Sequence, residues 1–163
     1  MEYHEIEQPN DLTKKEKEDA MGAYLMMFAS VGAGLPLPII NLIASIVYFI
    51  INKGKSRFVK FHSYQSLLSQ FPTTVINAVG VFWAVQIFLL DNYEVTDIFK
   101  GYVLMAVVLN LVYFIFSIVG AVKARKGLMY YFIFFGKLSY HYAYAKSPTS
   151  EVAKVIQNVP PKL

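Results

Sequence analysis

The sequence predicts an all-α integral membrane protein, a bundle of four helices with an aromatic C-terminal segment at the membrane interface. Hydrophobic residues make up 56% of its 163 residues and charged residues only 16%, and the mean hydropathy is +0.43. A soluble domain of this length carries more charge on its surface. The apolar residues also fall in long continuous blocks, which indicates that lipid is the solvent.

Residues 1–13 are polar and acidic, and we expect them to be disordered. No apolar stretch precedes the first block, so no cleaved signal peptide is predicted. Thr13 and Glu16 have the spacing of a capping box, which predicts that a helix starts at Lys14. A helical membrane domain is therefore expected over residues 14–145, followed by a polar tail at 146–163.

The first apolar block, residues 20–51, contains a Gly- and Pro-rich break at 32–38. One unbroken helix over this block would be about 48 Å long, too long for one span. We expect two helices, 14–31 and 37–51, each short for a hydrocarbon core of about 30 Å. The two helices either cross the bilayer as a tight hairpin or form a re-entrant hairpin, which enters the bilayer and returns to the same side. The bundle then has four transmembrane helices, or two short hairpin helices and two full spans.

Two further apolar blocks follow. The third helix is expected over residues 61–90, with a bend at Pro72, which cannot donate a backbone hydrogen bond. An acidic loop at 91–97 separates it from the clearest span, residues 102–122. The aromatic stretch 128–144 is too short to cross, and tyrosines and phenylalanines bracketed by lysines are typical of the interface.

The charge distribution predicts the orientation. If the chain crosses four times, only Lys100 of the 15 Lys and Arg residues lies on the side of the acidic loop. The positive-inside rule then places both termini in the cytoplasm. The basic residues lie at the ends of apolar blocks, so nucleic acid is not an expected partner.

Polar residues recur along the apolar helices at spacings of three and four. Asn41, Asn77 and Asn110 lie on these stripes, and we expect them at helix interfaces, where a hydrogen bond between helices contributes about 1 kcal/mol. The alternative is a polar groove that conducts a solute.

A basic cluster lies where the second expected helix ends and the third begins. The candidate contacts for lipid or partner proteins are Lys53, Lys55, Arg57, Lys60 and His62. Such clusters bind anionic lipid headgroups at about 1 kcal/mol per charge, although they also arise simply as topology determinants. His62 has no acidic residue near it in sequence, which favours a structural role over a metal site.

The sequence contains none of the residue patterns that usually carry catalysis. The chain has no cysteine, and it contains no serine-hydrolase motif, HExxH motif, phosphate loop or paired carboxylates. The apolar centres of the spans hold no charged residue or histidine, which argues against ion-coupled transport. We predict that the protein is not an enzyme and needs no cofactor or metal.

Two stretches carry a family resemblance, RFVKFHSYQSLL at residues 57–68 and GAVKARKG at 120–127. They resemble a widespread bacterial family of small multi-span membrane proteins. That family is similar to the MamF-type magnetosome membrane proteins and to the Tic-type subunit of the chloroplast inner-envelope import translocon. The resemblance implies a helical membrane domain with cytoplasmic termini, and it implies no particular chemistry.

The functional hypothesis is a non-enzymatic integral membrane protein. It would act as a scaffold or complex subunit through contacts with other membrane proteins, with lipids or with copies of itself. The alternative is a subunit of a protein-translocation pathway or channel, which the similarity to the chloroplast subunit suggests.

Overall fold

The computed structural model describes residues 2–32 and 38–146, and the regular elements within them are helices. Two helices are long and apolar enough to cross a membrane, whereas the sequence allows up to four crossings. In chain order the elements are α1 (Lys14–Leu25), η1 (Met26–Phe28), α2 (Ala29–Gly32), α3 (Pro38–Asn52), α4 (Arg57–Phe88), α5 (Asp97–Arg125) and α6 (Phe135–Tyr144).

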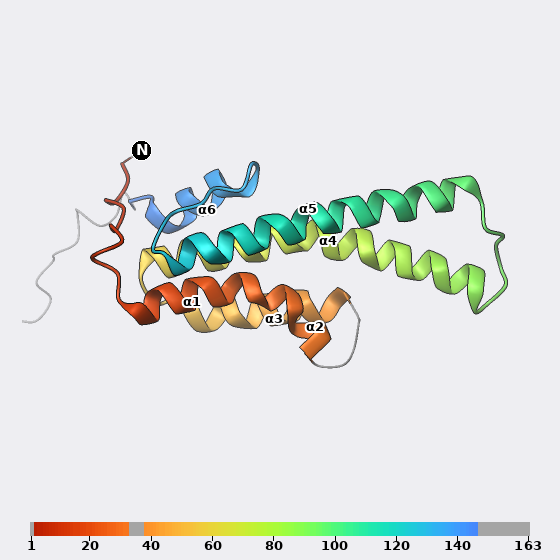
Figure 1. Cartoon of the computed structure of the whole chain (residues 1–163), viewed down its shortest axis with the longest axis horizontal. Helices are drawn as coiled ribbons and strands as arrows, with labels where there is room; N and C mark the ends of the chain where they lie inside the picture. Colours follow the sequence, from red (N-terminus) through yellow and green to blue (C-terminus); the bar gives the residue numbers. More distant parts are fainter. Residues whose placement is uncertain (1, 33–37, 147–163) are drawn as a thin grey trace, which may run out of the picture.

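α4 and α5 form a long antiparallel pair that runs the whole length of the molecule (Figure 1). Each begins at a side-chain cap, because the Ser56 hydroxyl accepts from the Val59 N–H and the Thr96 hydroxyl accepts from the Phe99 N–H. Pro72 lies inside α4 without ending it. The third helix is thus longer than expected and starts within the basic cluster, at Arg57.

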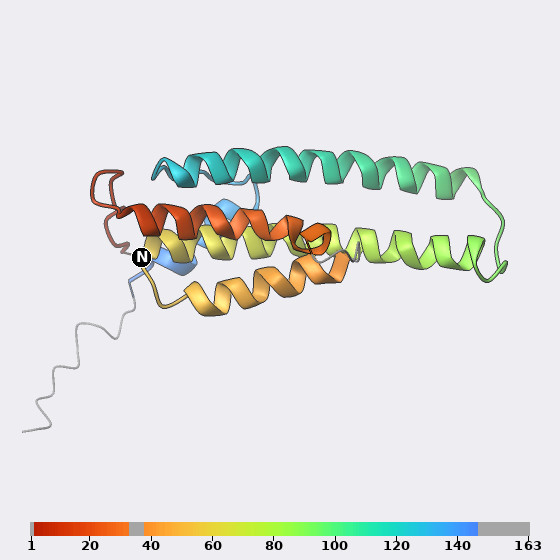
Figure 2. The ribbon, with the colours of Figure 1, turned by 60° about the horizontal axis from the view of Figure 1, so that its bottom comes forward.

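The shorter helices cover only part of this pair. α1 packs against α4 and α5, and α3 packs against α4. Figures 1 and 2 show that α4 and α5 continue well beyond them, toward the loop at the far end. The first expected helix, 14–31, is divided into α1, η1 and α2. The break between the hairpin helices, expected at 32–38, lies mostly outside the described residues.

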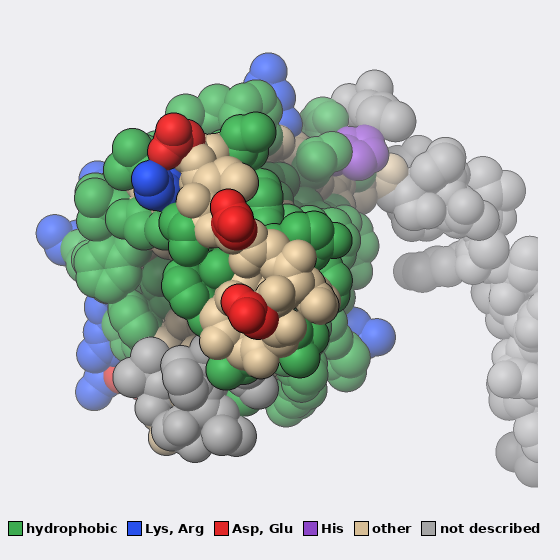
Figure 3. Space-filling view, turned by 90° about the vertical axis from the view of Figure 1, so that its right-hand side faces the viewer, with side chains coloured by type: hydrophobic (Ala, Val, Ile, Leu, Met, Phe, Trp, Pro, Cys, Tyr) green, Lys and Arg blue, Asp and Glu red, His purple; other side chains and the backbone are tan. Residues whose placement is uncertain are grey.

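Ion pairs fix the polar start of α1. Glu18 bonds to Arg125 of α5 at 2.6 Å, and Asp19 bonds to Lys55, just before α4, at 2.6 Å. The opposite end of the molecule carries the acidic loop, and Figure 3 shows its carboxylates lying among hydrophobic side chains. Asp91, Glu94 and Asp97 are exposed there. The two ends therefore differ in charge as the sequence predicts.

Residues 2–8 differ from the expected disorder, because they dock on α6. Tyr3 forms an isolated antiparallel bridge with Ala145, and the His4 N–H donates to the Tyr144 carbonyl. The Tyr144 hydroxyl donates to Glu7 at 2.6 Å. The reason is tertiary: α6 returns to the same end of the bundle, where its last turn offers free backbone groups and an aromatic surface.

The capping box at the start of α1 gives a first testable prediction. The Thr13 hydroxyl accepts from the Glu16 N–H, and the Glu16 carboxylate accepts from the Thr13 N–H at 2.8 Å. Thr13→Ala should therefore lower the free energy of unfolding by about 1 kcal/mol at pH 7. The Thr13 hydrogen bonds hold the pKa of Glu16 below its usual value.

A group with a depressed pKa stabilises the folded state above its unfolded-state pKa and loses that effect as the pH falls through the folded-state value. The cost of Thr13→Ala should accordingly shrink in acid. Unfolding in mixed micelles at pH 7 and pH 3 measures this, with the exposed Asn10→Ala as control. A cost that did not change with pH would contradict the assigned role of the Glu16 carboxylate.

Candidate functional site

A buried polar cluster joins α1 to α4 at the basic end of the bundle. The Tyr24 hydroxyl lies 2.8 Å from Nδ1 of His62. The rings of Phe58 and Phe61 contact the His62 ring edge-on, with centroids 4.5 and 4.9 Å away. Tyr24 and His62 are both fully buried. The imidazole is thus held in the interior by one hydrogen bond and three aromatic rings.

This placement corrects the sequence-based grouping of His62 with the surface cations. His62 is 0% exposed, so it contacts neither lipid nor a partner protein in this structure. The reason is helical periodicity: His62 shares the inward face of α4 with Phe58, Gln65 and Ser66, while Arg57 faces outward.

Gln65 extends the cluster to the C-terminal segment. Its amide Nε2 donates to the Tyr24 hydroxyl and to the Tyr130 carbonyl, each at 2.8 Å. Its Oε1 accepts from the Phe132 N–H at 3.1 Å. One buried side chain therefore satisfies the backbone of residues 130–132 and holds them against α4. A second bond, from the Ser66 hydroxyl to the Ala23 carbonyl, ties α4 to α1.

The three predicted interface asparagines all lie between helices. Asn77 of α4 and Asn110 of α5 exchange amide hydrogen bonds of 2.9 and 2.7 Å. Asn41 of α3 accepts from the Ser30 N–H of α2 at 2.7 Å. Their amides bond to groups on neighbouring helices or to their own helix.

The predicted basic cluster is only partly a free surface. Lys53 and Arg57 are exposed. Lys55 bonds to Asp19, and the Lys60 ammonium lies 4.4 Å from the centroid of the Tyr142 ring. Two of the four cations therefore have contacts within the chain, one of them an ion pair and the other a cation–π contact.

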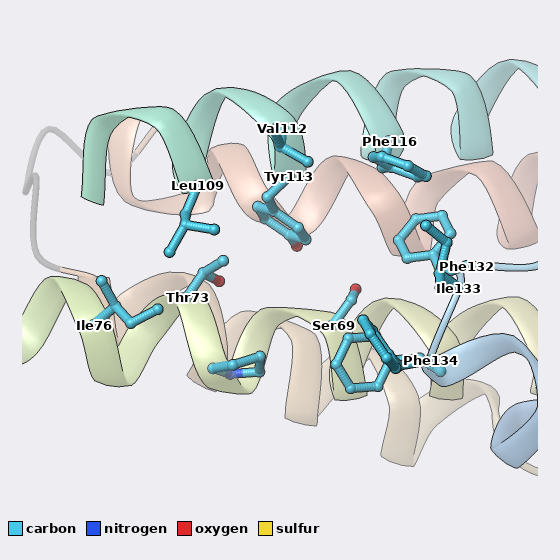
Figure 4. Close-up of a pocket in the computed structure, with 12 residues that line it drawn as sticks. Ser69, Thr73, Ile76, Leu109, Val112, Tyr113, Phe116, Phe132, Ile133 and Phe134 are labelled. Carbon is cyan, nitrogen blue, oxygen red and sulfur yellow. The ribbon is translucent and has the colours of Figure 1, made fainter. Parts of the chain in front are cut away.

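A cavity of about 250 Å³ lies between α4, α5 and residues 132–135 (Figure 4). Its lining is apolar apart from three hydroxyl-bearing residues, Ser69, Thr73 and Tyr113. The hydroxyls of Ser69 and Thr73 donate to carbonyls of their own helix. The cavity can therefore hold an apolar group, and its lining contains no Asp, Glu, His, Lys or Arg side chain.

Within the described residues, no group of three or more His, Asp or Glu side chains is placed to hold a metal ion. The polar groups are instead used for packing between helices. Sequence reasoning missed the roles of Tyr24 and Gln65 in joining three segments. A single tyrosine hydroxyl at the start of an apolar block was the available signal, but its partner lies 38 residues away.

A comparison with protein families matches residues 16–138 to the magnetosome magnetite crystal formation protein family. The match includes both stretches that carry the resemblance, together with most of α1 and all of α2 to α5. It confirms the similarity to MamF-type proteins and gives no support to a link with the chloroplast import subunit. No match was found among curated proteins or among solved structures.

Proposed function

Because the chain belongs to the magnetosome magnetite crystal formation protein family, we propose that it acts in that process as a non-enzymatic integral membrane protein. It would work through contacts with other membrane proteins, with lipids or with copies of itself. The observation that carries the proposal is that the buried side-chain amides form hydrogen bonds between segments of the bundle. Gln65, Asn77 and Asn110 bond to groups on neighbouring segments, so their amides join parts of the bundle to one another.

The surface of the bundle supports the same proposal. α4 and α5 expose large aliphatic and aromatic side chains along their outer halves, as lipid contact requires. Lys53 and Arg57 remain free at the basic end to bind anionic headgroups or an acidic partner. Residues 14–145 would form one membrane domain of the bacterial cell membrane, with both termini in the cytoplasm and residues 146–163 as a tail.

Single cysteines test this orientation, since the chain has none of its own. In intact cells Asn92→Cys, in the acidic loop, should react with an impermeant maleimide. Lys53→Cys should react only after permeabilisation. Gly32→Cys, where an added side chain meets nothing within 4 Å, should stay unreactive from both sides because α2 would end inside the bilayer. The reverse pattern for residues 92 and 53 would exclude the orientation.

Two experiments test the function itself: capture of binding partners, and measurement of solute flux through liposomes. Protein purified in mild detergent should retain specific membrane-protein partners or copies of itself, identified by cross-linking and mass spectrometry. The double variant Lys53→Glu/Arg57→Glu should lose partners that bind the basic end, whereas Lys100→Glu, at the opposite end, should keep them.

Liposomes separate this proposal from a channel. Purified protein should not release trapped ions or small solutes. Flux that Asn77→Leu abolishes and the exposed control Val79→Leu preserves would contradict the proposal and favour a conducting path along the interface between α4 and α5.

A further inference from the structure

The two halves of the membrane domain differ in the number of helices that they contain. The depth of each short helix can be read from its contacts with α4 and α5. In α5, residues 102–122 would be about 31 Å long, which matches a hydrocarbon core of about 30 Å. Asn110 lies near the middle of this stretch, so the Asn77–Asn110 pair marks the approximate centre of the bilayer.

The helices α1 and α2 reach only this centre. Glu18 bonds to Arg125 at the basic end, and a side chain at Gly120 would touch the Tyr24 ring. Farther along, the Phe28 ring contacts the Phe114 ring, with centroids 5.8 Å apart. α2 ends four residues later, at Gly32, and because it turns away from the axis of α1 (Figure 1) it stays close to this depth.

α3 starts at the same depth. Ser45 of α3 hydrogen-bonds to Gln70 of α4. The first residue of α3, Pro38, lies seven residues from Ser45, about 10 Å deeper and level with Asn77. From there α4 continues for about another 16 Å to Phe88. Figure 1 shows this unaccompanied stretch of α4 and α5.

The C-terminal segment adds to the same half. Phe132 lies beside Tyr24, with ring centroids 5.7 Å apart, and Tyr142 stacks on Tyr64 near the start of α4. Among the described residues, the half of the bilayer at the basic end thus contains α1, α2, α3 and residues 128–134 beside α4 and α5. Of the described residues, those in the other half belong to α4, α5 and the acidic loop that joins them.

We infer that the protein is a wedge, broad in the cytoplasmic leaflet, that favours membranes curved with that leaflet convex. The inference rests on the orientation in the proposed function. A helix with its side chains is about 10 Å across, so each helix confined to one leaflet widens that half by roughly 80 Å². Segments inserted into one leaflet bind in a curvature-sensitive way. A convex leaflet has more area per molecule near its headgroups, which accommodates the broad end.

Tubes pulled from giant vesicles test the wedge. The protein carries one fluorophore at Lys53→Cys and is reconstituted in both orientations at low density, where molecules are isolated. An impermeant quencher identifies the molecules whose basic end faces outward. These should be enriched in the tube relative to the flat membrane, increasingly so as the tube narrows. Molecules in the opposite orientation should be depleted. Equal tube-to-vesicle ratios for the two orientations would overturn the inference.

A variant locates the effect. Changing three exposed residues of α3 to Asn, namely Ile43, Ile46 and Ile50, should weaken insertion of α3. The tube-to-vesicle ratios of the two orientations should then both approach one. The control changes Leu104, Val107 and Leu111 of α5 to Ala and should sort like the wild type. Wild-type sorting by the α3 variant would also overturn the inference. Because sorting is read from isolated molecules, its failure is distinct from a failure to find partners.

Discussion

Replacing Gln65 with leucine is expected to lower the free energy of unfolding by about 3 kcal/mol. The side chain is fully buried, and its amide satisfies the Tyr24 hydroxyl, the Tyr130 carbonyl and the Phe132 N–H. Leucine has a similar volume and no polar atoms, so the substitution leaves the Tyr130 carbonyl and the Phe132 N–H without this partner in the interior, while the Tyr24 hydroxyl keeps its bond to His62. A buried polar group that loses its partner costs about 1–3 kcal/mol.

The matched control for this change is Gln86→Leu on the same helix. Gln86 accepts one hydrogen bond from Asn92 at the exposed end of α4, and its loss should cost less than about 1 kcal/mol. Unfolding of both variants in mixed micelles, followed by circular dichroism, gives the comparison. Proteolysis should also cut residues 128–134 sooner in Gln65→Leu than in the wild type. Equal stabilities for the two variants would show that Gln65 does not hold the C-terminal segment.

Gly120→Ala is the second substitution with a large expected effect. A Cβ atom at this position in α5 would lie 2.9 Å from Cε1 of Tyr24, whose ring is fully buried among α4, α5 and Phe132. The ring cannot move without breaking its hydrogen bonds to His62 and Gln65. Overpacking of this kind costs about 1–3 kcal/mol, and we expect the same loss in the free energy of unfolding.

Gly101→Ala provides the control within the same helix. An added Cβ meets nothing within 4 Å there, so the better helix propensity of alanine should leave stability unchanged or raise it by about 0.5–1 kcal/mol. Opposite signs for the two substitutions are the expected result. A neutral Gly120→Ala would mean that α1 does not pack against α5 as closely as the structure shows.

Composition and local pattern determined the class of this protein and the approximate positions of α3, α4 and α5. Apolar blocks define α4 and α5 because lipid leaves a backbone no partners except its own helix. The capping box at Thr13 and Glu16 was predicted correctly because both partners lie within one helical turn. The family resemblance at residues 57–68 and 120–127 was also readable, and the family comparison confirms it.

Only the tertiary structure decided how far the short helices extend beside α4 and α5 and where the polar side chains point. The buried position of His62 depends on its hydrogen bond to Tyr24. That of Gln65 depends on residues 130–132, which lie 65 positions or more away in the chain. Periodicity along one helix identifies a polar face but not the group opposite to it. Likewise, the length of an apolar block does not state how far its helices extend along their neighbours. Those properties come from contacts between segments, such as Glu18 with Arg125 and Ser45 with Gln70, which local sequence does not specify.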